Sequence, residues 1–139
     1  MNVVGWWKLV SITSTAPDGK RTTPFGAHPT GTLYYSADGR MMLMISYDGR
    51  AKLSGADRVA APAAERAEAF ATFISYSGRY TITGGEIRHH IELCSYQNWV
   101  GTDQVRILHV EGRRLSLVTP PLSINGATQS NELAWERVD

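Results

Sequence analysis

The hairpin that decides the fold lies in the stretch Tyr76-Ser77-Gly78-Arg79-Tyr80-Thr81-Ile82-Thr83-Gly84-Gly85-Glu86-Ile87-Arg88-His89-His90-Ile91-Glu92-Leu93. Aromatic or aliphatic residues alternate with mostly polar ones on both sides of the glycine pair. Two glycines in a row tolerate the positive φ angles of a two-residue hairpin turn. We therefore predict two antiparallel strands joined at Gly84-Gly85.

A two-residue turn fixes which residues face one another across this hairpin. The pairs expected on one face are Ile82 with Ile87, Tyr80 with His89, Gly78 with Ile91 and Tyr76 with Leu93. This face is apolar except for the histidine and the tyrosine hydroxyls, whereas Arg79, Arg88 and Glu92 fall on the other face. We expect His89 to point inward and His90 to point outward.

Turn signals divide the rest of the chain into further extended segments and one helix. The eight extended segments span residues 5–15, 31–37, 40–47, 74–83, 86–96, 103–111, 114–119 and 131–138. The helix spans 62–73, with proline at its first position and many alanines, and a stripe of Ala63, Ala67, Phe70 and Ala71 is expected to cap or flank the sheet. We predict an all-β fold in one domain over residues 1–139: an eight-stranded up-and-down antiparallel barrel with one short helix between strands 3 and 4.

The connections between these segments differ in length in a regular way. Three are tight, at 37–39, 84–85 and 111–113, whereas those near 16–30, 48–73, 97–102 and 120–130 are longer. Alternate connections of a meander lie at opposite ends of a barrel, so the tight turns should close one end and the long segments should surround a mouth. Phe25, Trp99 and Pro120-Pro121 are candidate parts of a lid over this mouth.

The other two tight turns determine which residues of their strands pair on the inner face of the barrel. The expected inward pairs are Tyr35 with Met41, Leu33 with Leu43, Val110 with Leu115, Leu108 with Leu117 and Arg106 with Thr119. Arg106 is therefore expected to point inward among apolar residues, with Gln104 one step closer to the mouth. Because burial of an isolated charge is costly, Arg106 needs a partner or an anionic ligand.

Seven motifs are spread over nearly the whole chain. They are Gly5-x-Trp7-Lys8-Leu9-Val10-Ser11, Pro24-Phe25-Gly26, Pro29-x-Gly31-x-Leu33-x-Tyr35-x-x-Asp38-Gly39, Tyr76-x-Gly78-x-Tyr80, His89-His90-x-Glu92, Asn98-Trp99-x-Gly101-Thr102-Asp103-Gln104-Val105-Arg106 and Trp135-Glu136-Arg137. Together they resemble the lipocalin-like domain family of small bacterial and fungal proteins. The resemblance implies a lipocalin-type barrel whose closed end packs Trp7 under Arg137. Family members also occur near natural-product pathways, which leaves enzymatic roles open.

Composition narrows the classes of partner. The 139 residues include 14 basic and 13 acidic ones, for a net charge of +1, so neither nucleic acid nor a membrane is an expected partner. The single cysteine cannot form an internal disulfide, and we expect no metal site and no cofactor. The sequence begins without signal-peptide features, so a cytoplasmic location is expected, and a homodimer stays open.

Two functions fit these patterns. The first is a binding protein that encloses a small, mainly hydrophobic molecule. Its expected contacts are Phe25, Leu33, Tyr35, Met41, Leu43, Tyr76, Leu93, Trp99, Gln104 and Leu117. The alternative is a cofactor-independent isomerase or cyclase of a natural-product-type substrate, with His89 as general acid/base, Tyr80 as proton donor and Arg106 as electrophilic clamp. The two functions can be distinguished by whether His89, Tyr80 and Arg106 converge on one cavity. A barrel filled by its own side chains would instead indicate a purely structural role.

Overall fold

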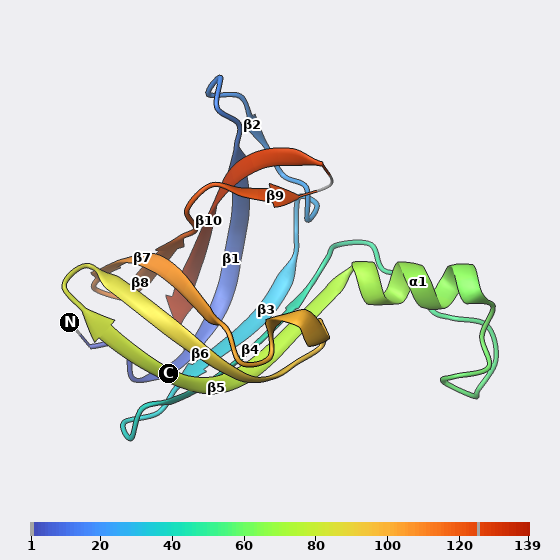
Figure 1. Cartoon of the computed structure of the whole chain (residues 1–139), viewed down its shortest axis with the longest axis horizontal. Helices are drawn as coiled ribbons and strands as arrows, with labels where there is room; N and C mark the ends of the chain where they lie inside the picture. The colour runs from blue at the N-terminus through green and yellow to red at the C-terminus, as the bar shows by residue number, and fades with distance from the viewer. Residues whose placement is uncertain (1, 125) are drawn as a thin grey trace.

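The computed structural model describes residues 2–124 and 126–139, which form one antiparallel sheet closed into a barrel (Figure 1). The strands are β1 Gly5–Thr15, β2 Arg21–Thr22, β3 Thr30–Tyr35, β4 Arg40–Ser46, β5 Phe73–Thr83, β6 Glu86–Cys94, β7 Asp103–Glu111, β8 Arg114–Val118, β9 Leu122–Ile124 and β10 Ala127–Arg137. One α-helix, α1, spans Ala63–Ala71, and a short 3₁₀ helix, η1, spans Gln97–Trp99. The sheet order is β2-β1-β3-β4-β5-β6-β7-β8-β10-β9, and β1 also pairs with β10.

The barrel itself has the eight strands that the sequence predicts. It closes through β1, β3, β4, β5, β6, β7, β8 and β10. The two extra strands are short: β2 pairs with the end of β1, and β9 pairs with the start of β10. The helix therefore follows β4 instead of a third strand, because the prediction did not include β2.

Short and long connections separate to the two ends of the barrel. The tight turns β3–β4, β5–β6 and β7–β8 lie at one end, at the lower left in Figure 1. The segments that carry β2, α1 and β9 lie at the other end. This arrangement follows from the up-and-down order, since successive antiparallel strands turn at alternate ends.

The predicted register of the glycine hairpin holds as far as the pair of Gly78 with Ile91 and then shifts. Ile82 pairs with Ile87 and Tyr80 with His89 as predicted, but Tyr76 pairs with Cys94, because a β-bulge interrupts the ladder between Ser77 and Gly78. An extra residue in one strand moves the following side chains to the opposite face.

Leu93 therefore points outward, with 71% of its surface exposed, and its predicted place in the barrel is wrong. Gly78 marks the irregularity, because a Cβ atom there would lie 1.9 Å from the backbone oxygen of His90. Only glycine permits this approach of the two backbones.

The other inward pairs build the core. Leu33 pairs with Leu43, Tyr35 with Met41, Leu108 with Leu117 and Val110 with Leu115, all as predicted. Apart from the half-buried Val110, these residues are buried. They pack with Trp7, Ile12, Ile87 and Trp135 in a single apolar cluster. The interior toward the tight turns is thus filled by side chains.

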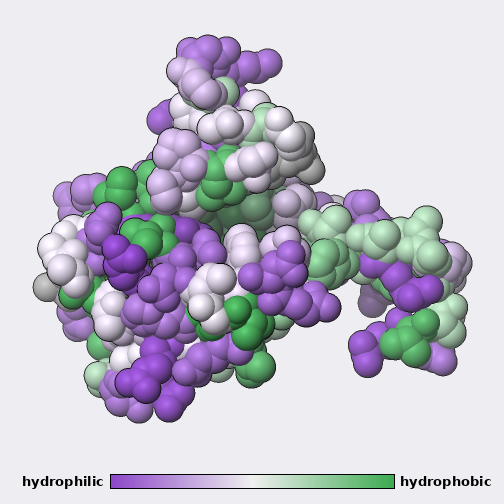
Figure 2. Space-filling model, in the orientation of Figure 1, coloured by the Kyte–Doolittle hydropathy of each residue, from purple (hydrophilic) through white to green (hydrophobic). Residues whose placement is uncertain are grey.

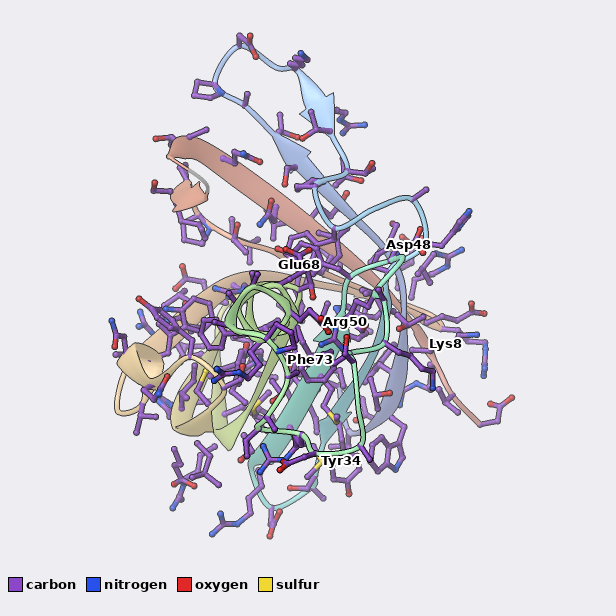
Figure 3. The ribbon with its side chains drawn as sticks, turned by 90° about the vertical axis from the view of Figure 1, so that its right-hand side faces the viewer. Lys8, Tyr34, Asp48, Arg50, Glu68 and Phe73 are labelled. Atoms are coloured by element: carbon purple, nitrogen blue, oxygen red, sulfur yellow. The ribbon has the colours of Figure 1, made fainter. Side chains whose placement is uncertain are left out.

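Helix α1 does not cap the sheet. None of its residues is buried, and it projects from the barrel (Figure 1). Its expected stripe is mostly alanine, which offers little apolar area for burial, and Figure 2 shows only weakly apolar surface along it. Arg50 holds its C-terminal end by donating hydrogen bonds to the Ala69 carbonyl and the Thr72 hydroxyl, and its guanidinium lies 5.0 Å from the centre of the Phe73 ring (Figure 3).

The end of the barrel opposite α1 is closed by a tryptophan and an arginine. Trp7 is fully buried and pairs with Arg137, whose guanidinium carbon lies 4.2 Å from the centre of the indole ring. Arg137 also donates to the carbonyl oxygens of Val4 and Asn2, and the Trp7 indole donates to that of Val3. The pair therefore ties the N-terminal segment to the last strand.

Replacing Trp7 tests this closure. We expect Trp7→Ala to lower the free energy of unfolding by about 3–5 kcal/mol, because it leaves a cavity and removes the ring under Arg137. Trp6→Ala, at a position that is 47% exposed, should cost much less. Urea denaturation of both variants measures the difference, and equal losses would contradict a closing role for Trp7.

Candidate functional site

A cavity of about 310 Å³ occupies the barrel interior toward the mouth. Its lining is mostly apolar, with a few polar groups that converge on it. Lining residues include Phe25, Leu43, Ile45, Tyr47, Phe70, Phe73, Ile74, Tyr76, His89, Trp99, Arg106, Leu117, Thr119, Asn131 and Leu133. In Figure 2, apolar surface is visible in the recess between β9 and β7. This size lies at the lower end of the about 300–1,000 Å³ typical of small-molecule pockets.

Aromatic side chains from separate connections surround the mouth. Trp99, on η1, contacts Tyr76 with ring centres 6.2 Å apart and Tyr96 at 5.9 Å. Phe25 packs on Tyr47 at 4.2 Å. Phe70, from α1, is 55% exposed beside the opening. Aromatic rings of this kind offer large contact area to an apolar ligand.

His89 lies in the cavity wall and is fully buried. Its Nε2 atom lies 2.6 Å from the Tyr35 hydroxyl, and its Nδ1 atom lies 2.7 Å from the Tyr76 hydroxyl. Burial, helped by the positive charge of Arg106, lowers the pKa of His89 to about 3. The imidazole is therefore neutral near pH 7, with each nitrogen held by a tyrosine.

The two tyrosines keep their protons. Burial raises the pKa of Tyr76 to about 12 and raises that of Tyr35 well above its usual value, although Arg106 acts in the opposite direction on both. Both hydroxyls are thus hydrogen-bond donors as well as acceptors at neutral pH.

Arg106 brings a positive charge into the same wall. It is only 8% exposed, and its Nη1 atom donates to the backbone oxygen of Val105 at 2.9 Å. Within residues 2–124 and 126–139, no carboxylate forms an ion pair with it. The remaining N–H groups of the guanidinium are available to a molecule in the cavity.

A polar group on β10 was missed by the sequence analysis. Asn131 is buried in the cavity wall, where its side chain accepts a hydrogen bond from the Ser14 hydroxyl and its backbone N–H donates to the Thr119 hydroxyl. Period-two alternation could have found it, because Asn131 shares a face with Leu133 and the buried Trp135.

The residues singled out from the sequence fall into three groups. Phe25, Leu43, Tyr76, His89, Trp99, Arg106 and Leu117 line the cavity. Leu33, Tyr35 and Met41 are buried in the core outside the cavity lining. Tyr80, Leu93 and Gln104 are absent from the lining.

Tyr80 does not line the cavity together with His89 and Arg106, and the convergence of these three residues is the feature that distinguishes the enzymatic alternative from a binding protein. Tyr80 is the cross-strand partner of His89, but it lies closer to the tight turns, and its hydroxyl donates to the Ser36 backbone oxygen at 2.7 Å. Tyr76 takes the place beside the histidine instead. The half-buried Gln104 donates to the Thr102 hydroxyl at 3.3 Å.

The sequence profile of a family described as "Lipocalin-like domain" matches residues 4–138. A curated relative, the "4'-hydroxy-3'-methoxypropiophenone carrier protein ppsC" of Aspergillus oryzae, is 35% identical over 101 residues, which cover 66% of this chain and 86% of the relative. A solved structure of an uncharacterized protein from Bacteroides eggerthii aligns with a TM-score of 0.49 at 12% identity, over 99% of this chain and 100% of that one.

Helix length and the grouping of possible metal ligands bear on membranes and metals. Among the described residues, no helix is long and apolar enough to span a bilayer. Within the same residues, no group of three or more His, Cys, Asp or Glu side chains is arranged to hold a metal ion.

The buried state of His89 predicts a pH dependence of stability. The unfolded chain binds a proton at this histidine below its ordinary pKa of 6.5, whereas the folded protein does so only near 3, so the free energy of unfolding should fall as the pH drops between these values. The slope from this group is about 1.4 kcal/mol per pH unit.

His89→Gln cannot titrate and should lack this part of the slope. Urea denaturation of both proteins from about pH 7.5 to about pH 4.5 compares the slopes, so a difference in absolute stability does not matter. Parallel curves would show that His89 is not held neutral by the fold.

Proposed function

Because the chain belongs to the lipocalin-like domain family, we propose that it binds and carries a small, mainly hydrophobic molecule inside its barrel. The bound molecule carries an acidic or carbonyl group that lies beside Arg106. The apolar wall and the aromatic mouth supply most of the contact area.

The observation that carries this proposal is the unpaired guanidinium in the cavity wall. Arg106 is almost fully buried, and no carboxylate of the described residues balances its charge. A buried cation is costly without a partner, and an oxygen of a ligand would supply one. The cavity therefore combines space for an apolar body with a strong donor for one polar group.

The Aspergillus relative supports the same proposal. Its name describes a carrier of 4'-hydroxy-3'-methoxypropiophenone, which is an aromatic ketone. We propose that this chain takes a ligand of similar size and polarity.

Acid/base catalysis of an isomerase or cyclase reaction fits the site less well. Both nitrogens of His89 are engaged by tyrosines, and its low pKa prevents it from taking up a second proton near neutral pH. A general base needs a free nitrogen within reach of the substrate and a pKa near the working pH. These features favour binding over turnover.

Isothermal titration with 4'-hydroxy-3'-methoxypropiophenone tests the proposal, and mass spectrometry of the recovered compound separates carrier from enzyme. We expect saturable binding of one molecule per chain and recovery of unchanged ketone. Conversion of the ketone into an isomer or cyclic product would favour the enzymatic alternative.

Arg106→Met should weaken this binding by about 1.5–3 kcal/mol, since methionine keeps much of the volume but removes the charged donor. Stability should change little or rise, because an unpaired buried cation is replaced by an apolar group. Arg88→Met, on the exposed outer face of β6, is the matched control and should bind as the wild type does. If Arg106→Met unfolds the protein while its folded fraction keeps full affinity, the arginine is only an internal brace.

A further inference from the structure

Tyr35, His89 and Tyr76 form a linear chain of hydrogen bonds that ends at the cavity. The Tyr35 hydroxyl contacts one nitrogen of the imidazole at 2.6 Å, and the Tyr76 hydroxyl contacts the other at 2.7 Å. All three side chains are buried, but only His89 and Tyr76 line the cavity. The chain therefore has an inner end at Tyr35 and an outer end at Tyr76.

A neutral imidazole has one N–H donor and one acceptor nitrogen. One tyrosine must therefore donate its proton to His89, and the other must accept a proton from it. The accepting tyrosine can still donate its own O–H proton to a third group that is a hydrogen-bond acceptor. The accepting tyrosine is therefore the one whose hydroxyl can reach such an acceptor.

The burial of Tyr35 decides the direction of the hydrogen bonds in this chain. The side chain of Tyr35 is completely buried and does not line the cavity. Among the described residues, its hydroxyl has His89 as its hydrogen-bond partner. If Tyr35 accepted from His89, its own proton would be buried without an acceptor, which is unfavourable. Tyr35 therefore donates to Nε2, and the histidine proton sits on Nδ1.

The outer end of the chain follows from this tautomer. Nδ1–H donates to the oxygen of Tyr76, so the Tyr76 proton is left without an acceptor in the chain. Because Tyr76 lines the cavity, a group in the cavity can accept that proton. Arg106, in the same wall, is also a donor and cannot accept one.

We propose that Tyr76 and Arg106 together recognise the carbonyl oxygen of a small hydrophobic ketone or aldehyde, and that Tyr35 and His89 are positioning residues that keep the Tyr76 proton directed at it. This inference rests on the proposed carrier function and gives it a substrate class. A carbonyl oxygen accepts two hydrogen bonds, one from each donor. An alcohol at the same place would bring a proton of its own into a site whose groups already donate.

Three probes with one carbon skeleton test the recognition: propiophenone, the alcohol obtained by reducing its carbonyl, and propylbenzene. We expect the wild type to bind the ketone about tenfold more tightly than the alcohol or the hydrocarbon, the scale of one good hydrogen bond. Tyr76→Phe should lose about this factor for the ketone and keep its affinity for propylbenzene. Isothermal titration measures all the affinities.

Tyr34→Phe is the matched control. Tyr34 does not line the cavity and packs on Trp6, so the loss of its hydroxyl should leave the preference for the ketone unchanged. If Tyr76→Phe keeps the preference for the ketone, or loses no more of it than Tyr34→Phe does, the donor is misassigned and the proposal is wrong.

The positioning role has a readout that is independent of ligand. Nitrogen-15 chemical shifts of His89 in the wild type should be those of the pure Nδ1–H tautomer. In Tyr35→Phe, the Nε2 atom of His89 loses its hydrogen-bond donor, so we expect a mixture of the Nδ1–H and Nε2–H tautomers. The preference for the ketone should also become weaker, although residue 35 does not line the cavity. An Nε2–H tautomer in the wild type would overturn the proposed direction of the chain.

Equal binding of all three probes would leave a carrier of apolar molecules and overturn carbonyl recognition. If none of the probes binds, both the carrier function and its substrate class are overturned, whatever the tautomer of His89.

Discussion

The pairing of β1 with β10 is the interaction on which the rest of the structure depends. It closes the sheet, so every second side chain of the barrel strands points into an enclosed space. Inside such a space a polar group has little water to bind, and its partners must come from the protein or from a ligand. His89 and Asn131 find protein partners, whereas Arg106 has only one backbone carbonyl among the described residues.

Closure also explains why the cavity lies where it does. Toward the tight turns, large residues such as Trp7, Trp135 and Tyr35 are fully buried and occupy the interior. Toward the long connections, the ladder gives way to loops, and Tyr76, Leu117, Thr119 and Asn131 line the space that remains. The ligand space is thus the part of the barrel that side chains do not fill.

Much of this could be predicted from the sequence, because period-two alternation and tight turns are local signals. The pairs of Tyr80 with His89 and of Leu33 with Leu43 followed from turn length alone. The bulge beside Gly78 could not be placed in this way, since it depends on how closely two backbones approach. It reversed the predicted orientation of Leu93.

The same limit applies to the candidate site. Alternation correctly placed His89 and Arg106 inside, but it does not say how far along the barrel axis a side chain reaches. Tyr76 and Tyr80 share a face in the sequence pattern, yet only the ring of Tyr76 reaches the cavity, and the Tyr80 hydroxyl turns to Ser36 at the tight-turn end. The helix was found, but its lack of buried residues depends on tertiary packing that composition does not reveal.

The exposed position of α1 has a consequence for kinetics. Because none of its residues is buried, α1 is held beside the mouth by surface contacts such as those of Arg50, and the core does not depend on it. Phe70 and Ala71 at its end border the cavity. For a carrier of the proposed kind, substitutions on the exposed face of α1 would change the rates of ligand entry and exit more than the equilibrium affinity, whereas substitutions in the barrel wall would change the affinity.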